Sequence, residues 1–212
     1  MVNVGGGMQM LIEDTRSCGR IIWDDFDLVD RLWKRIEAAL PELHKFDSGK
    51  SKLIVGNGPI KRGETWKMTR LNERMRFLRY EGGEYFRRKS TIQLLFIPPR
   101  YLRNLNESAT NTVFPAHCDG TYETPDRTER SYVTLHLYLN EAESPAPGEK
   151  PLKGGATAFH SYNMQKQFNV EPKIGRVLVF QHRFLLHSGD DVVEGTKLTM
   201  RTDVMYKKEE KR

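Results

Sequence analysis

Three side chains of types that bind transition metals stand out in the sequence. His117 and Asp119 are separated by one residue, and a further imidazole, His187, follows much later in the chain. If residues 117–119 are extended, the first two side chains point to the same side of the backbone and can converge on one ion. Two imidazoles and one carboxylate leave part of the coordination shell open, which is typical of non-haem Fe(II) oxygenases.

Other kinds of site could use the same residue types. A His-x-Asp pair by itself is a weak signal, because it arises by chance in surfaces and cores. A structural zinc site closes with a fourth ligand, usually cysteine. Cys118 stands between the two ligands and would point to the opposite side of an extended segment, so it is a poor fourth ligand. A metal-dependent hydrolase would need a general base beside the metal, and the sequence offers no evident one.

Two cations follow the distal imidazole. Strand alternation from Lys197 puts Thr199 and Arg201 on the same face. A cation buried inside a β-structure needs an anion. A dicarboxylate co-substrate bound to the metal at one end would supply that anion at its other end. The alternative is that Lys197 and Arg201 both point to solvent.

The elements that would position these residues can be read from periodicity. Apolar residues at three- and four-residue spacing predict a helix over residues 20–40, with Asp24 or Asp25 as its cap and Pro41 beyond its end. Strand-like segments follow, and residues 141–153 are predicted to be a loop. One helix followed by short strands favours a single, mainly β domain, a sandwich or a barrel. The predicted strands are residues 75–80, 132–139, 156–159, 176–181 and 198–206.

Composition narrows the class of protein. The chain has 212 residues, 38% of them hydrophobic and 29% charged, which fits one globular domain. It contains no apolar run long enough to span a membrane, and we see no signal peptide, so we expect a cytoplasmic or nuclear location. The net charge of +6 is scattered, so we do not expect a nucleic-acid partner. The two cysteines make no disulfide framework.

Taken together, the motifs resemble those of the prolyl 4-hydroxylase-like family of iron(II)- and 2-oxoglutarate-dependent dioxygenases. The resemblance covers roughly residues 74–86 and 117–207, and the order and spacing of its pieces are specific. These pieces are Arg79-Tyr80-Glu-Gly-Gly83, His117-x-Asp119-Gly120, Thr134-x-His-x-Tyr-Leu-Asn140, Gly154-Gly-Ala-Thr-Ala-Phe159, Gly175-Arg-Val-Leu-Val-Phe180 and His187 through Tyr206.

The resemblance implies a double-stranded β-helix, which is a jelly-roll, cupin-like barrel. It implies Fe(II) as the metal, with His117, Asp119 and His187 as ligands, and 2-oxoglutarate as the co-substrate. Lys197 would bind the distal carboxylate of 2-oxoglutarate, with Arg201 as the second choice for that role. Tyr80 matches a tyrosine that lines the same pocket. Ascorbate is the reductant that the family suggests, and the remaining histidines match no ligand position.

The activity implied is a hydroxylation in which O2 and 2-oxoglutarate are consumed and succinate and CO2 are formed. The primary substrate, a peptidyl proline or a small molecule, cannot be read from the sequence. Residues 121–131 follow the first two ligands as a polar loop, and we expect them to help form the substrate mouth. The main alternative is a catalytically impaired jelly-roll binding module that retains the metal site.

Residues 88–116 depart from the family pattern. In the family, the strand that ends in Arg-Tyr-x-x-Gly runs almost directly into Pro-His-x-Asp, whereas here this segment intervenes. We hypothesise that it is translated intron. Codons for Arg88-Lys89-Ser90 can contain a splice donor, and those for Pro115-Ala116 can contain an acceptor whose removal restores Pro before His117. The alternative is a genuine loop insertion. The chain also begins late relative to the family, so we expect a shortened N-terminus.

Overall fold

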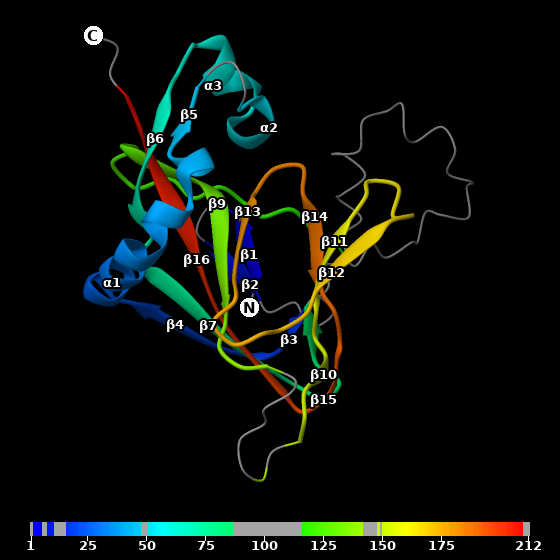
Figure 1. Ribbon diagram of the computed structural model, residues 1–212. Coiled ribbons are helices and arrows are strands. Elements are labelled where there is room, and N and C mark those ends of the chain that lie inside the picture. Colours follow the sequence, from blue (N-terminus) through cyan, green and yellow to red (C-terminus); the bar gives the residue numbers. More distant parts are fainter. Residues whose placement is uncertain are drawn as a thin grey trace.

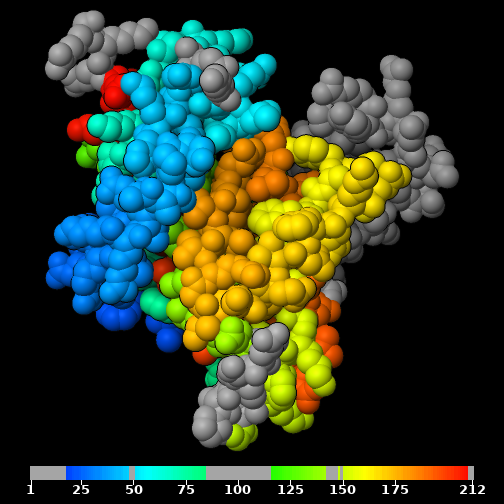
Figure 2. Space-filling view, viewed as in Figure 1, coloured from blue at the N-terminus to red at the C-terminus, as the bar shows by residue number. Residues whose placement is uncertain are grey.

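The computed structural model describes residues 2–5, 8–10, 16–47, 51–86, 116–141, 148 and 150–209. Two β-sheets form the body of the protein, and helices cover the outer side of the larger sheet (Figure 1). In the space-filling view, the helices and the hairpin of residues 157–170 lie on either side of residues 177–189 (Figure 2). The candidate site lies between the two sheets, because side chains from both meet there.

The larger sheet has seven antiparallel strands, and β16 is its longest and most connected member. β16 pairs with β9 along one edge and with β7 and then β6 along the other. The strands are β4 (Gly19–Asp24), β5 (Lys45–Phe46), β6 (Trp66–Leu71), β7 (Arg74–Glu81), β9 (Glu129–Tyr138), β13 (Val177–Gln181) and β16 (Thr196–Lys208).

The smaller sheet has five strands in the order β12-β11-β14-β8-β3. Its strands are β3 (Arg16–Ser17), β8 (Tyr85–Phe86), β11 (Thr157–His160), β12 (Gln167–Val170) and β14 (Leu186–Gly189). Two short ribbons accompany the sheets, β1 (Val2–Gly5) with β2 (Met8–Met10), and β10 (Lys153–Gly154) with β15 (Val192–Glu194). The expected mainly β, jelly-roll fold is confirmed. Within the described part of the chain, no strand pair joins the two sheets into a closed barrel.

The helices are short, and the predicted helix over residues 20–40 is only partly correct. α1 (Phe26–Ile36) begins after Asp25, whose carboxylate accepts a hydrogen bond from the Leu28 amide at 2.9 Å. Residues 19–24 are instead strand β4, because they pair with β7 along the edge of the larger sheet. The other helices are η1 (Glu37–Ala39), η2 (Pro41–Leu43), α2 (Lys52–Val55) and α3 (Asn57–Lys61).

The two faces of β16 have different environments. On one face, Met200 and Val204 pack in a core with residues of α1 such as Val29 and Trp33. On the opposite face, alternation places Lys197, Thr199, Arg201 and Asp203 between the two sheets. The strand therefore anchors the hydrophobic core with one set of side chains and carries polar groups into the site with the other.

The predicted strands correspond to β7, β9, β11, β13 and β16, with shifts of a few residues at their ends. The segment proposed as translated intron lies outside the described residues, apart from Ala116, which is buried. Among the described helices, none is both long enough and apolar enough to cross a membrane.

Candidate metal centre and co-substrate pocket

His117 and His187 are held together by their own backbones. The amide of His117 donates to the carbonyl of His187 at 2.8 Å, and the reverse hydrogen bond measures 2.9 Å. This isolated bridge ties His117 to β14. It brings the two imidazole rings to a centroid separation of 4.3 Å. Two residues that are far apart in the sequence are thus fixed as neighbours by a pair of hydrogen bonds.

Asp119 completes the cluster. Its Oδ1 lies 3.6 Å from Nε2 of His117 and 3.6 Å from Nε2 of His187. Potential ligand atoms of the three residues all lie within 4.8 Å of one another. Cys118 is not a member of this group, in agreement with its predicted orientation. The arrangement can place one metal ion against two imidazole nitrogens and one carboxylate oxygen, which is a donor set suited to Fe(II).

Both oxygens of Asp119 have further partners. Arg201 Nη2 donates to Oδ1 at 2.6 Å, and the Thr134 hydroxyl donates to Oδ2 at 2.6 Å. Burial alone would raise the pKa of Asp119, but the charge of Arg201 and the nearby imidazoles hold that pKa well below its usual value. Asp119 is therefore an ionised carboxylate, oriented by two donors as metal-binding carboxylates commonly are.

The distal imidazole is neutral. Burial lowers the pKa of His187 to about 3, and the proximity of His117 acts in the same direction. Its Nδ1 lies 3.2 Å from the Leu185 carbonyl, and this contact leaves Nε2 facing Asp119. A neutral imidazole held in this way by its second nitrogen has the form in which histidine binds metals.

Lys197 is a buried cation, with 3% of its surface exposed. Its Nζ lies 5.5 Å from the ring centroid of Tyr80 and 5.7 Å from that of Tyr138. Among the described residues we find no ion pair to it. Burial lowers the pKa of Lys197 to about 8. The structure thus brings Lys197 and Tyr80 together, as expected, whereas Arg201 contacts Asp119 instead.

Several polar atoms between the sheets lack hydrogen-bond partners among the described residues. They are Nε2 of His136, Oγ1 of Thr199 and Nε of Arg201. These residues lie on the same face of β9 and β16 as Lys197. Buried polar groups in native proteins are normally satisfied, so this set marks a place for a polar ligand. Its positive side chains fit a dicarboxylate.

The remaining histidines differ in their surroundings. His182 is buried, with Nε2 3.5 Å from Asp203 Oδ1, and His160 Nε2 lies 2.8 Å from the Ser188 hydroxyl. Neither is a member of the His117, Asp119 and His187 group. His136 lies directly opposite Arg201 on β9 and faces the pocket. Its position was accessible from the sequence only through its alternation with Thr134 and Tyr138.

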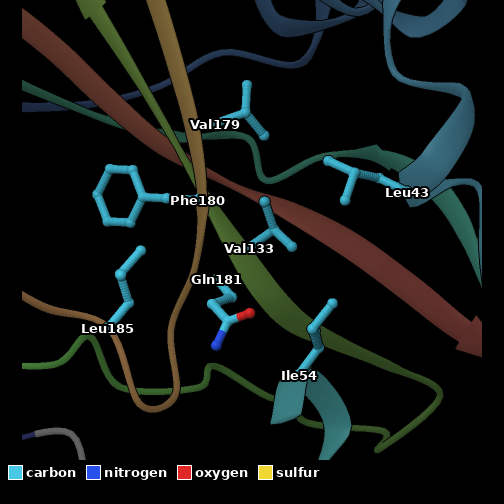
Figure 3. Close-up of a pocket in the computed structure, with 7 residues that line it drawn as sticks. All are labelled: Leu43, Ile54, Val133, Val179, Phe180, Gln181 and Leu185. Atoms are coloured by element: carbon cyan, nitrogen blue, oxygen red, sulfur yellow. The ribbon is translucent and has the colours of Figure 1, made fainter. Parts of the chain in front are cut away.

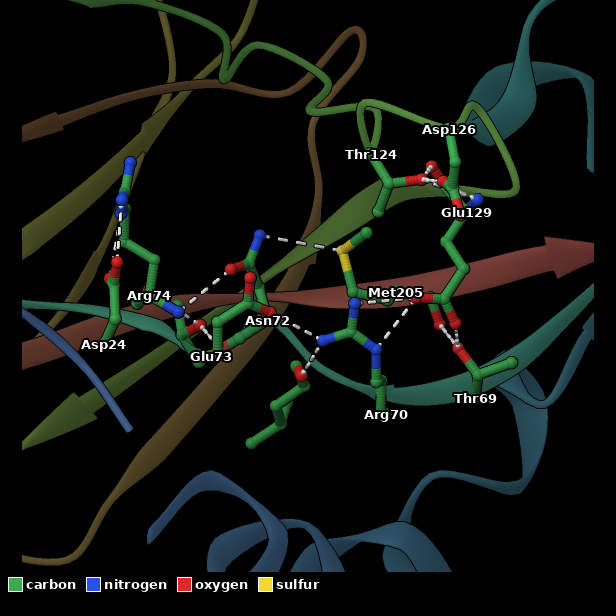
Figure 4. A network of polar contacts seen from close by, with 12 residues as sticks. Asp24, Thr69, Arg70, Asn72, Glu73, Arg74, Thr124, Asp126, Glu129 and Met205 are labelled. Atoms are coloured by element: carbon green, nitrogen blue, oxygen red, sulfur yellow. Dashed lines mark hydrogen bonds and ion pairs between the residues drawn. The ribbon is translucent and has the colours of Figure 1, made fainter. Parts of the chain in front are cut away.

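Polar contacts within residues 121–131 and with β6 hold this loop in place. The Thr124 hydroxyl donates to Asp126 at 2.6 Å, and Glu129 accepts from Thr69 and Arg70 of β6 (Figure 4). These bonds fix the loop to the larger sheet. Its expected role at the substrate mouth stays a prediction.

An apolar cavity of about 370 Å³ lies between the helices and the edge of the larger sheet (Figure 3). Apart from Gln181, its lining is apolar, so it offers no metal ligands. It nevertheless adjoins the candidate site, because the ring centroids of Phe180 and His187 are 4.8 Å apart. The lining residues are Leu43, Ile54, Val133, Val179, Phe180, Gln181 and Leu185.

Comparisons with known proteins can now be set beside this geometry. Residues 103–202 match the model of the 2OG-Fe(II) oxygenase superfamily. No curated protein matched the chain. A Pseudomonas putida prolyl-4-hydroxylase structure is 16% identical, with a TM-score of 0.48, over 91% of this chain and 73% of that one.

Two further solved structures are similar to a comparable degree. A viral collagen prolyl hydroxylase of Paramecium Bursaria Chlorella virus-1, in complex with 2OG, is 16% identical, with a TM-score of 0.46, over 91% of this chain and 80% of that one. A Trichoplax adhaerens prolyl hydroxylase, in complex with a hypoxia inducible factor peptide fragment, is 15% identical, with a TM-score of 0.48, over 92% and 66%.

The match over residues 103–202 contains all three residues of the metal-binding group and both interior cations. This match to the 2OG-Fe(II) oxygenase superfamily spans slightly less than half of the chain. The chain is a protein of the 2-oxoglutarate-dependent dioxygenase class, as its motifs predicted.

Proposed function

We propose that the protein is a hydroxylase of the prolyl 4-hydroxylase type that uses Fe(II), O2 and 2-oxoglutarate. The overall reaction converts 2-oxoglutarate, O2 and a C–H bond of the substrate into succinate, CO2 and a C–OH group. The observation that carries this proposal is the convergence of His117, Asp119 and His187, with buried Lys197 in the same space between the sheets.

Each residue has a defined part in the proposed site. His117, Asp119 and His187 would hold the metal, which supplies the redox chemistry when it is bound. Lys197 would bind the distal carboxylate of 2-oxoglutarate, and Tyr80 would form the wall beneath that ammonium group. The residues that surround the site exclude bulk water, which strengthens these charge interactions. The motifs shared with prolyl 4-hydroxylases support the reaction type, and ascorbate is the reductant that we propose.

The test is an anaerobic titration of the purified chain with Fe(II) and 2-oxoglutarate. A 2-oxo acid that chelates Fe(II) gives a visible charge-transfer absorption, and we expect this band for the wild type but not for His117→Ala. O2 is then admitted and succinate is measured. A wild type that forms the band but makes no more succinate than His117→Ala would be a binding module. Absence of the band would contradict the proposed function.

A further inference from the structure

Strand β4 forms a border of the larger sheet and carries apolar side chains on its exposed surface. It pairs with β7 along one edge, and among the described residues no strand pairs with its other edge (Figure 1). Ile21, Ile22 and Trp23 follow one another in this strand and are 67%, 39% and 50% exposed. Border strands of native sheets are normally protected by charges, prolines or a covering segment, because their unpaired backbone groups attract another strand. An exposed apolar border therefore indicates a surface for association.

The direction of the backbone groups of β4 follows from one hydrogen bond just beyond its end. The amide of Asp25 donates to the carbonyl of Glu73 at 3.1 Å, so the backbone groups of Asp25 point to the β7 side. In an antiparallel sheet, the backbone groups of successive residues point alternately to the two sides of the strand. Ile21 and Trp23 therefore bond towards β7 as well. The backbone groups that point away from β7 are those of Arg20, Ile22 and Asp24.

A second copy of the same strand is complementary to this edge. A two-fold axis at Ile22 would pair Ile22 with itself in the second copy and Arg20 with Asp24 of the second copy. All the outward-pointing backbone groups of the strand would then form hydrogen bonds across the axis. Opposite charges would lie across from each other at both ends of the pair, and Ile21 would pack against Trp23 on the other face. Cross-strand pairs of both kinds stabilise antiparallel sheets.

Asp24 has accepting capacity left for this pairing. Arg74 donates to its two carboxylate oxygens at 2.9 and 2.7 Å, yet the Asp24 side chain remains 44% exposed. A carboxylate offers more acceptor positions than one guanidinium group fills. Arg20 of a second copy can therefore bind Asp24 without displacing Arg74.

The border strand of the smaller sheet lacks this complementarity. β12 also carries an exposed apolar side chain, since Phe168 is 69% exposed. Its four residues, Gln-Phe-Asn-Val, include no charged side chain, so no two-fold pairing of β12 with itself would place opposite charges across from each other.

We propose that the protein forms a two-fold symmetric dimer in which the β4 strands of two copies pair antiparallel about Ile22. The two larger sheets then become one continuous sheet. Each copy keeps its own metal centre, because β4 contains no member of the His117, Asp119 and His187 group. The dimer is independent of the proposed hydroxylase function.

Sedimentation velocity of the purified chain over a range of protein concentrations tests the proposal. The wild type should shift from the monomer mass towards twice that mass as the concentration rises. Arg20→Glu and Asp24→Arg each place like charges across from each other at both ends of the strand pair, and each should weaken dimerisation about 10-fold. An equimolar mixture of the two variants restores opposite charges at both ends of a mixed pair. It should therefore form mixed dimers with an affinity close to that of the wild type.

Ile22→Pro tests the backbone pairing itself. It removes an N–H group that points away from β7, a position at which a border strand tolerates proline, so thermal melting should show a retained fold and dimerisation should be lost. Phe168→Ser is the matched control, because it removes an exposed apolar side chain from β12 and should leave the dimer unchanged. If Ile22→Pro does not fold, the mixture of charge variants decides the question.

A wild type that stays monomeric at every concentration would overturn the proposal, and this is the result expected if another protein or another part of this chain occupied the edge. A dimer that persists in a folded Ile22→Pro variant would place the contact elsewhere and would overturn it too. The same holds if mixing the two charge variants fails to restore dimerisation.

Discussion

Lys197 and Tyr80 face each other across the paired strands β16 and β7, with the ammonium nitrogen 5.5 Å from the centroid of the phenol ring. The contact accommodates a buried cation that forms no ion pair with any described residue. Cation–π attraction offsets part of the cost of removing the ammonium group from water, but not all of it. Burial lowers the pKa of Lys197 from its ordinary 10.5 to about 8, and this shift reflects the desolvation cost that is not offset.

The first prediction is that replacing Lys197 stabilises the protein but weakens its binding of 2-oxoglutarate. The pKa shift corresponds to about 3 kcal/mol at neutral pH in the protein without co-substrate. Lys197→Met keeps a flexible apolar side chain and removes the charge, so we expect it to raise the free energy of unfolding by roughly 2–3 kcal/mol. It should also weaken 2-oxoglutarate binding. Denaturant unfolding and ligand titration measure the two effects, and a less stable variant would contradict the assignment of Lys197 as an uncompensated buried charge.

The second prediction concerns the pH dependence of stability. In the folded protein Lys197 loses its proton near pH 8, whereas in the unfolded chain it does so near its ordinary value of 10.5. The unfolded state binds more protons between these values, so stability rises with pH across this window. The difference in unfolding free energy between Lys197→Met and the wild type should be fully present below pH 8 and should disappear towards pH 10.5. A difference that stays constant with pH would contradict it.

The third prediction is that the ionisation of Lys197 also controls co-substrate binding. Stability should rise with pH, whereas the affinity for 2-oxoglutarate should fall. A carboxylate bound beside Lys197 favours the charged ammonium, as do the more distant charges of Asp190 and Glu171. Binding of 2-oxoglutarate above pH 8 should therefore take up close to one proton, and affinity should decrease as pH rises. Calorimetry in buffers with different ionisation enthalpies measures this uptake. Lys197→Arg serves as the control, since arginine stays charged and should bind without proton uptake.

A further prediction concerns the space that Gly155 leaves for Lys197. Gly155 has a φ of +74°, and a Cβ there would lie 3.1 Å from Lys197 Cδ. We expect Gly155→Ala to shift the lysine side chain and to weaken 2-oxoglutarate binding several-fold, with about 1–2 kcal/mol of backbone strain. Gly175→Ala is the matched control, because Gly175 has a φ of +75° and no atom within 4 Å of the added Cβ. It should lose similar stability and bind 2-oxoglutarate normally. Equal binding by both variants would show that Gly155 does not shape the pocket.

The final prediction tests the support of the metal ligand by Thr134. Its hydroxyl donates to Asp119 Oδ2 at 2.6 Å, and Thr134→Val removes this donor with little change of shape. We expect Fe(II) affinity to fall about 10- to 100-fold, as for other partners of metal ligands. Thr202→Val is the control, since the Thr202 hydroxyl donates to the Asn72 carbonyl at 2.7 Å on the opposite face of β16. It should cost about 1–3 kcal/mol of stability and leave Fe(II) affinity unchanged. Chelator competition measures both affinities.

Local sequence patterns predicted the elements only where tertiary contacts agreed with them. The alternation of residues 198–206 and the cap at Asp25 both led to correct elements. Residues 20–24 fall within the predicted helix over residues 20–40, yet they form most of β4. Their pairing with β7 supplies a row of backbone hydrogen bonds that no local propensity reveals. Short strands such as β8 and β14 were missed for the same reason.

The sequence by itself determined the kinds of groups in the site and the family that the chain resembles. Residue types, order and spacing are enough for this, because His-x-Asp, a distal histidine and a later cation are features of the chain alone. Only the tertiary structure decided which charged side chains contact one another. Arg201 and Lys197 look equivalent on one strand face, but the backbone bridge between His117 and His187 fixes Asp119 beside Arg201 and leaves Lys197 over Tyr80. Pairing between charges depends on distances across the two sheets, and these distances arise only when both sheets have formed.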